Sequence, residues 1–245
     1  MKAMVLAAGL GTRLRPLTND RPKALVEVAG RTLLELTLAR LRAFGIHDVI
    51  INTHYFADLI AAYLRRHENF GMHIEISYEE VLLDTGGGIK RAASFFQDSD
   101  EPFLVHNVDV LSTIDFHEML RFHNERDALA TLAVQNRATS RYLLFDENSQ
   151  LCGRRSGETG EPEMVRPAMT TQALAFCGIH VVSPRIFPLM LEAGTFSVIP
   201  LYLRLAEQSG AVLAYRANRY YWRDLGRPEH IEQAAHEISK GDYQD

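Results

Sequence analysis

The chain has 245 residues, 47% of them hydrophobic, with 26 lysines and arginines against 31 aspartates and glutamates. This mild acidic excess argues against a general nucleic-acid-binding protein, in which clustered basic residues would dominate. The two cysteines, Cys152 and Cys177, form no C-x-x-C pair and indicate neither a disulfide framework nor a zinc site, so a cytoplasmic location is expected. No apolar run approaches the length of a membrane span, and we expect no membrane partner.

Apolar runs and helical patterns alternate through the first half of the chain. Strands are predicted over residues 3–7, 49–51, 74–76 and 103–105, and helices over residues 33–44, 56–64 and 89–96. Thr32 followed by Glu35 forms a capping box before the first helix. This alternation predicts an α/β fold with a mostly parallel sheet and helices on both faces, and such sheets bind ligands at the carboxyl ends of their strands.

The second half of the chain has longer apolar runs. Strands over residues 129–134, 142–145 and 173–182 are expected to be partly antiparallel, so the sheet is expected to be mixed. The polar stretch from Arg154 to Pro162 is predicted as an exposed loop. No linker composition separates two units, and we expect a single domain over residues 1–245.

A glycine-rich loop follows the first strand and carries the strongest functional signal. Glycine lets backbone N–H groups approach phosphate oxygens, and cations on the same loop can neutralise the bound charge. The loop is neither a Walker P-loop nor a dinucleotide fingerprint, because Leu14 replaces the third glycine and Pro16 prevents a helix from starting there. A NAD-dependent oxidoreductase is therefore disfavoured, and a nucleoside triphosphate site is favoured over an ordinary turn. The expected nucleotide contacts are Leu6, Ala7, Ala8, Gly9, Gly11, Thr12, Arg13 and Lys23.

The segments G-L-G-T-R-L-R-P-L-T (residues 9–18) and P-K-A-L-V-E-V-A-G (residues 22–30) resemble the signature of the sugar-1-phosphate nucleotidyltransferases. The resemblance implies a Rossmann-like fold of the nucleotide-diphospho-sugar transferase type. It also implies formation of an NDP-sugar and pyrophosphate from an NTP, UTP or GTP, by attack of a sugar 1-phosphate on the α-phosphate. The chain is similar to small members that act on N-acetylmuramate 1-phosphate or mannose 1-phosphate. The first half would bind the nucleotide and residues 135–235 the sugar.

Two aspartates end predicted strands and could hold a metal ion. Mg²⁺ is typically bound by one or two carboxylates together with phosphate oxygens and water, although a strand-end aspartate is also a common turn former. Asp109 and Asp224 match the family's N-G-D and W-x-D-x-G positions, except that Val108 replaces the glycine. We expect these two aspartates to bind Mg²⁺, Arg13 to contact the β- and γ-phosphates, and Lys23 the α-phosphate. Arg13, Lys23 and Asp109 are the expected catalytic residues.

Further contacts are expected on the nucleobase and sugar sides. The glycines at 86–88 precede the predicted helix, and Gly87 is expected to contact the base; the alternative is a tight turn with Thr85 as N-cap. Asn107 and Gly178 are expected on the sugar side, since residues 176–179 resemble the family's sugar-side strand. The family's Glu-Lys-Pro motif has no clear counterpart. The candidates to replace it are Arg141, Arg154 and Arg155.

Two other functions share this fold or these motifs. A catalytically silent regulatory protein could bind a nucleotide sugar, and a phosphocholine cytidylyltransferase could use the same scaffold. A silent protein would be expected to have lost one of the charged residues of the site. Asp109, Asp224 and Lys23 are all present, which favours the enzyme.

Overall fold

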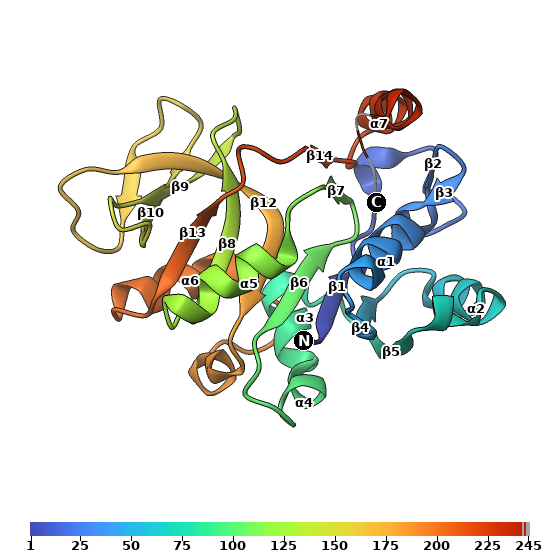
Figure 1. The fold of residues 1–245 in the computed structure, drawn as a ribbon, viewed down its shortest axis with the longest axis horizontal. Helices are drawn as coiled ribbons and strands as arrows, with labels where there is room; N and C mark the ends of the chain where they lie inside the picture. The colour runs from blue at the N-terminus through green and yellow to red at the C-terminus, as the bar shows by residue number, and fades with distance from the viewer. Residues whose placement is uncertain (242, 244–245) are drawn as a thin grey trace.

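A computed structural model describes residues 1–241 and 243 of the protein, and a mixed sheet forms its centre (Figure 1). The strands of this sheet are β1 (Ala3–Leu6), β4 (Asp48–Thr53), β5 (His73–Tyr78), β6 (Phe103–Asn107), β8 (Ala130–Gln135), β9 (Arg141–Phe145), β10 (Leu151–Ser156), β11 (Pro162–Met164), β12 (Gln172–Val182) and β13 (Val212–Arg216). Their order is β11-β10-β9-β12-β6-β1-β4-β5, with β8 beside β12 and β13 beside β8.

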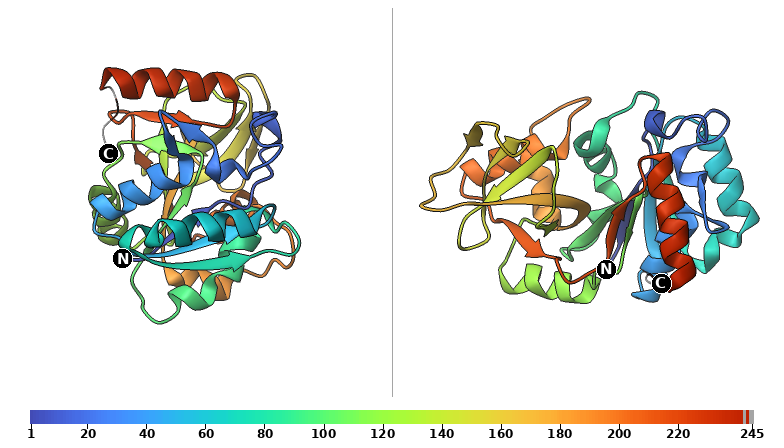
Figure 2. Two further views of the ribbon diagram at one scale, coloured as in Figure 1. Left: turned by 90° about the vertical axis from the view of Figure 1, so that its right-hand side faces the viewer. Right: turned by 90° about the horizontal axis from the view of Figure 1, so that it is seen from above.

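Helices cover both faces of the sheet, as the sequence predicts (Figures 1 and 2). They are α1 (Leu33–Ala43), α2 (Ala57–Arg66), α3 (Asp84–Arg91), α4 (Ala93–Phe96), α5 (Phe116–Glu125), α6 (Val198–Glu207) and α7 (Pro228–Lys240). Alternation along β1 assigns the faces: Ala3 and Val5 pack in the core beneath α1, α2, α5 and α7, whereas Met4 packs with α3, α4 and α6. The mixed α/β architecture is therefore confirmed.

Parallel pairing brings several strand ends to one edge. β1 pairs in parallel with both β4 and β6, and β4 with β5. Only beyond β6 does the sheet become antiparallel, through its pairing with β12. The carboxyl ends of β1, β4 and β6 consequently lie together, and the loop after β1 lies at the opposite end of that strand from the N-terminus (Figure 1).

Two small ribbons lie outside the main sheet. β2 (Glu27–Val28) pairs with β3 (Arg31–Thr32), and β7 (Val110–Ser112) pairs with β14 (Trp222–Asp224). The second ribbon joins the segment after β6 to one that lies more than 100 residues later in the chain. Short 3-10 helices are η1 (Thr12–Leu14), η2 (Lys23–Leu25), η3 (Glu68–Gly71) and η4 (Pro184–Leu189).

The first helix begins where the capping box predicts. The Thr32 hydroxyl accepts a hydrogen bond from the Glu35 backbone N–H at 3.1 Å, which satisfies one of the free donors in the first turn. The helix expected over residues 89–96 is instead two helices: α3 begins at Asp84, and α4 follows after a break at Ala92. Thr85 therefore lies inside α3, and the alternative of a tight turn with Thr85 as N-cap is wrong.

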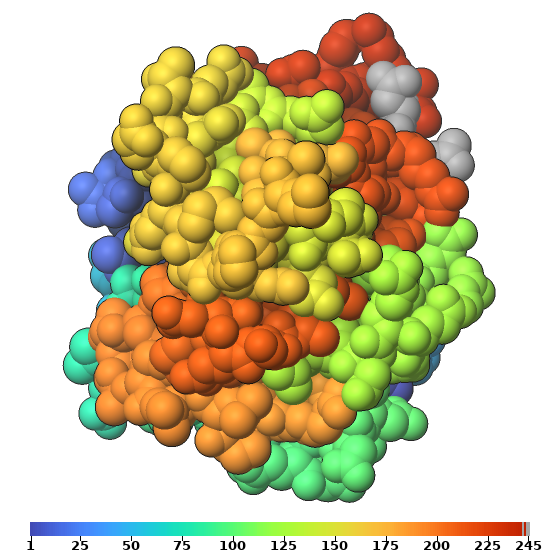
Figure 3. All heavy atoms as spheres, turned by 90° about the vertical axis from the view of Figure 1, so that its left-hand side faces the viewer, coloured from blue at the N-terminus to red at the C-terminus, as the bar shows by residue number. Residues whose placement is uncertain are grey.

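The predicted loop from Arg154 to Pro162 is also partly wrong. Arg154 and Arg155 belong to β10 and pair with Leu143 and Tyr142 of β9, and β11 begins at Pro162. Because the far end of this hairpin is exposed to solvent, its strands are polar and lack the apolar run from which strands were predicted. The space-filling view in Figure 3 shows this face of the molecule, where yellow residues of β10 and β11 lie above orange residues of η4 and α6, with green residues of α5 beside them.

Candidate active site

Lys23 and Asp109 form an ion pair at the edge where β1 and β6 end. Lys23 begins η2, and Asp109 follows β6 in a turn held by a hydrogen bond from the Val108 N–H to the Leu6 carbonyl at 3.1 Å. The Lys23 Nζ donates to Asp109 Oδ2, and the two side chains are only 11% and 15% exposed. Lys23 is thus not a solvated surface cation, and the structure brings it to one of the two expected metal ligands.

Asp224 lies beside Asp109 because β14 pairs with β7. In this ribbon Asp224 is opposite Val110, and the Leu225 N–H donates to the Asp109 carbonyl at 2.7 Å. The His230 Nδ1 lies 2.8 Å from the Asp224 carbonyl oxygen and holds the start of α7 against the ribbon. The two predicted ligands therefore come from adjacent positions of one ribbon.

Arg13 reaches the same place from the loop after β1. A Cβ placed on Gly226 would lie 2.8 Å from Asp224 Oδ1 and 2.9 Å from Arg13 Nη2. The Arg13 guanidinium and the Asp224 carboxylate thus lie close together, beside the position that a side chain at Gly226 would take. Three of the charged residues predicted for the site, Arg13, Asp109 and Asp224, are brought together by segments that are far apart in sequence.

The two glycines of the glycine-rich loop have different surroundings. Gly11 has φ +63°, and a Cβ there would lie 2.9 Å from Thr18 Cγ2 and 3.2 Å from Lys23 Cβ. The Thr18 hydroxyl donates to the Gly11 carbonyl at 2.9 Å. By contrast, a Cβ on Gly9 would meet no described atom within 4 Å. Gly11 therefore packs the loop onto Lys23, whereas Gly9 faces open space.

A buried polar network behind this loop was missed from the sequence. The Ala7 N–H donates to Asn52 Oδ1 at 2.7 Å, and Asn52 Nδ2 donates to Glu79 Oε1 at 2.8 Å. The other Glu79 oxygen accepts from the Leu83 N–H at 2.8 Å, and Glu79 is 1% exposed. The network joins the ends of β1 and β4 to the start of α3. Asn52 at the end of a strand was the only signal of it in the sequence.

The glycines at 86–88 are packed against protein atoms. A Cβ on Gly88 would lie 2.8 Å from Asn52 Nδ2, and one on Gly87 would lie 2.7 Å from the Gly194 carbonyl oxygen. These contacts explain why α3 requires glycine in its first turn. The expected contact between Gly87 and a nucleobase stays a prediction.

Asn107 and Gly178 meet on the other side of the ribbon. Gly178 has φ +72° and lies where the register between β12 and β8 shifts, between Phe176 and His180. A Cβ on Gly178 would lie 2.7 Å from Asn107 Nδ2 and 3.1 Å from Val110 Cγ2. The structure thus brings the two expected sugar-side residues into contact beside the β7–β14 ribbon.

Arg137, in the loop between β8 and β9, is a further cation here that the sequence interpretation did not include. Its Nη2 donates to the Phe176 carbonyl at 2.8 Å, and its guanidinium carbon lies 3.7 Å from the centroid of the Trp222 ring. The Trp222 indole N–H in turn donates to the Cys177 carbonyl at 2.7 Å. Burial lowers the pKa of Arg137, and the negative charge of Asp224 opposes this shift.

The three arginines proposed from sequence as replacements for the Glu-Lys-Pro motif have other surroundings. Arg154 pairs with Glu163 at 2.6 Å within the β10–β11 hairpin. Arg155 donates to the Gly157 carbonyl at 3.1 Å and lies over the Tyr142 ring. Arg141 is exposed at the start of β9. No contact ties any of the three to Asp224 among the residues that the structure describes.

Other reactive side chains near the site are buried and uncharged. Burial lowers the pKa of His106 to about 4, and its Nδ1 lies 2.8 Å from the Asn107 carbonyl oxygen. Burial raises the pKa of Cys177 to about 12, so this thiol is unreactive at neutral pH. Within the described residues no group of three histidine, cysteine or acidic side chains could hold a metal ion. None of the helices in residues 1–241 and 243 is long and apolar enough to cross a membrane.

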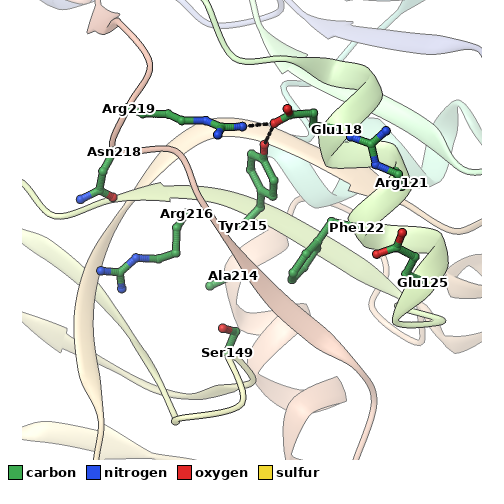
Figure 4. Close-up of a pocket in the computed structure, with 10 residues that line it drawn as sticks. All are labelled: Glu118, Arg121, Phe122, Glu125, Ser149, Ala214, Tyr215, Arg216, Asn218 and Arg219. Carbon is green, nitrogen blue, oxygen red and sulfur yellow. Dashed lines mark hydrogen bonds and ion pairs between the residues drawn. The ribbon is translucent and has the colours of Figure 1, made fainter.

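A surface hollow of about 570 Å³ lies away from these residues, between α5 and β13 (Figure 4). Glu118 on its wall is already paired: it accepts hydrogen bonds from the Tyr215 hydroxyl and from Arg219. The hollow contains none of the predicted site residues, so the charged cluster at the strand ends is the better candidate.

The comparisons with known proteins agree with this assignment. A family model described as nucleotidyl transferase matches residues 2–150. The chain belongs to this family. It is 38% identical to the N-acetylmuramate alpha-1-phosphate uridylyltransferase of Caulobacter vibrioides over 93% of this chain and 92% of that protein. It is 29% identical to a mannose-1-phosphate guanyltransferase of Candida albicans over 94% of this chain, which spans 62% of that relative.

Solved structures show the same fold. HddC from Yersinia pseudotuberculosis, complexed with GMP-PN, superposes with a TM-score of 0.76 at 22% identity, over 97% of this chain and 99% of that one. A putative glucose-1-phosphate thymidylyltransferase from Bacillus anthracis superposes with a TM-score of 0.79 at 17% identity, over the whole of this chain and 98% of that one. The predicted nucleotidyltransferase fold and the resemblance to sugar-1-phosphate nucleotidyltransferases are confirmed.

Proposed function

We propose that this nucleotidyltransferase uses UTP or GTP and a sugar 1-phosphate to form an NDP-sugar and pyrophosphate in the cytoplasm. An oxygen of the sugar phosphate would attack the α-phosphorus, and the bond between this phosphorus and the bridging oxygen to the β-phosphate would break. The observation that carries the proposal is the convergence of Lys23, Asp109, Arg13 and Asp224 at the strand ends. The names of the relatives, which include uridylyl- and guanylyltransferases, support the choice of nucleotide.

The charged residues fit a reaction that depends on positioning rather than on proton transfer. A sugar 1-phosphate is already ionised near neutral pH, so the difficulty lies in bringing two polyanions together and stabilising the departing pyrophosphate. Arg13 would hold the β- and γ-phosphates, and Lys23 would hold the α-phosphate after leaving Asp109. The open space at Gly9 gives the triphosphate access to the loop.

The two aspartates suit Mg²⁺, which usually takes one or two carboxylates and fills its other positions with phosphate oxygens and water. Asp109 already faces a cation, the Lys23 ammonium, and Asp224 follows on the neighbouring strand. Asp109 and Asp224 would therefore hold the ion, whose chemistry is to neutralise charge between the two substrates. Gly178, within the sugar-binding region proposed for residues 135–235, would contact the sugar, and so would Asn107, which packs against Gly178.

Pyrophosphate release tests the proposal. The protein is incubated with UTP, GTP, CTP or dTTP and with N-acetylmuramate 1-phosphate, mannose 1-phosphate, glucose 1-phosphate or phosphocholine, with Mg²⁺ or with EDTA. We expect release with a uridine or guanosine triphosphate and a sugar 1-phosphate, and none with EDTA or in an Asp224→Asn variant. Release with phosphocholine alone would identify a cytidylyltransferase instead. Nucleotide-sugar binding without release from any pair would identify a regulatory protein.

A further inference from the structure

Arg137 lies near the charged cluster and has no role in the proposal above. Arg13 lies in the glycine-rich loop and Lys23 follows it, whereas Arg137 lies in the loop between β8 and β9 and bonds to the bulge of β12 that contains Gly178. Its guanidinium lies on Trp222, and Trp222 and Asp224 are two residues apart on β14, so their side chains share one face of the ribbon. Arg137 therefore borders both the expected sugar contacts and an expected metal ligand.

The surroundings of Arg137 satisfy only part of its hydrogen-bonding capacity. Nη2 donates to the Phe176 carbonyl, and the ring of Trp222 covers one face of the guanidinium. The Nε–H is buried and has no hydrogen-bond partner among the described residues. Leaving a buried donor of a charged group unpaired is costly, so the protein atoms do not satisfy the full hydrogen-bonding capacity of this guanidinium.

The ligand that would complete this arginine is an anion with several oxygens. Guanidinium binds phosphate in a planar, two-pronged geometry and is held in position by stacking on an aromatic ring. In the proposed reaction the acceptor phosphate must approach a site that already contains two carboxylates and a triphosphate. A cation on the acceptor side would offset this repulsion.

We propose that Arg137 binds the phosphate of the sugar 1-phosphate and holds it for attack on the nucleotide. This inference rests on the proposed function and adds to it a residue that contacts the acceptor phosphate. Arg137 contacts the phosphate oxygens that do not react, so no proton is transferred and no bond to the arginine forms. Its hydrogen bond to Phe176 also fixes the bulge that carries Gly178.

Kinetics of an Arg137→Gln variant test the proposal, with KM measured separately for the two substrates. Loss of a charge-assisted hydrogen bond is expected to raise the KM of the sugar 1-phosphate roughly 10- to 100-fold. The KM of the NTP should stay within about 2-fold, which also shows that the variant is folded. Arg137→Lys, which keeps the charge but not the planar geometry, should recover part of the loss. Arg126→Gln is the matched control, because Arg126 also lies over an aromatic ring, that of Phe122, but outside the site.

The outcomes separate this inference from the proposed function. If the wild-type protein releases no pyrophosphate from any pair, the proposed function fails. If the wild type is active and Arg137→Gln leaves the acceptor KM unchanged, or raises both KM values equally, the inference alone fails. If the acceptor KM rose in Arg155→Gln but not in Arg137→Gln, the phosphate would be assigned to Arg155 of β10, and the inference would be overturned. The inference would also be overturned if Arg137→Gln raised the acceptor KM only for sugars that bear a carboxylate. In that case Arg137 would recognise the carboxylate and not the phosphate.

Discussion

Gly226→Ala is expected to abolish most activity while leaving the fold intact. The glycine is buried between the two charged groups that converge on the site, and an alanine Cβ would lie 2.8 Å from Asp224 Oδ1 and 2.9 Å from Arg13 Nη2. Ordinary contacts of a Cβ begin near 3.4 Å, so each group must move by roughly half an ångström or more. Both can move, because each is the end of a flexible side chain, and the backbone at Gly226 does not have the positive φ that would strain alanine.

The expected magnitudes differ for activity and for stability. Misplacement of a positioning group by about 1 Å can cost on the order of 100-fold in rate, so kcat should fall about 30- to 100-fold. The free energy of unfolding should change by less than about 1 kcal/mol, because only side-chain ends are displaced. The two effects are measured by pyrophosphate release at saturating substrates and by urea denaturation.

Gly210→Ala is the control variant, in which we expect stability rather than activity to fall. A Cβ on Gly210 would lie 2.8 Å from the Leu205 carbonyl oxygen, a backbone atom that cannot move alone. We expect this variant to lose about 1–3 kcal/mol of stability and to keep its kcat per folded molecule. If Gly226→Ala turned over at the wild-type rate, Arg13 and Asp224 would not act together at the site. If it unfolded like Gly210→Ala, the assignment of its effect to two side-chain ends would be wrong.

Two other predictions concern the ion pair and the buried histidines. Lys23→Met should lower kcat/KM at least about 100-fold, as loss of a donor to a charged transition state does, and near-wild-type turnover would remove Lys23 from the site. Burial lowers the pKa of His180 to about 3 and that of His123 to about 4, so both are neutral in the fold. Their contribution to stability, present above pH 6.5, is lost as the pH falls toward these values, by roughly 2–3 kcal/mol each at pH 4.5. Urea denaturation at pH 7.5 and pH 4.5 measures this loss, which should shrink in His180→Gln; an equal midpoint at both pH values would contradict it.

The elements with strong periodicity were predictable from the sequence, and so were the residues of the glycine-rich loop. Local patterns determine these features: the apolar run of β1, the capping box at Thr32 and Glu35, and the succession of strands and helices. The start of α3 was placed too late, because glycine has a low helix propensity and the packing that compensates for it comes from Asn52 and residues 194–196. A local sequence pattern cannot indicate contacts between residues that lie so far apart in the chain.

The residues of the candidate site could be proposed one at a time from the sequence, but the way they are brought together could not. Lys23 and Asp109 could be named from their motifs, whereas their ion pair depends on how the loop after β1 folds around Gly11. Glu79 and Arg137 were missed because neither belongs to a motif that marks it in the sequence. Their significance comes from burial and from partners that are distant in sequence: Asn52 for Glu79, and Trp222 for Arg137.

The β7–β14 ribbon brings residues from two halves of the chain to the proposed site. Residues 2–150, which match the family model, contain Arg13, Lys23 and Asp109, whereas Asp224 arrives from beyond that region. After β13 the chain returns along β14 to α7, which packs against the same core as α1 and α2 (Figure 1). Asp224 is thus anchored on one side by α7, through His230, and on the other by the hydrogen bond from Trp222 to the bulge of β12. A change in the angle between these two sides would move Asp224 relative to Asp109, so the geometry of the two proposed metal ligands would depend on both sides being held in place.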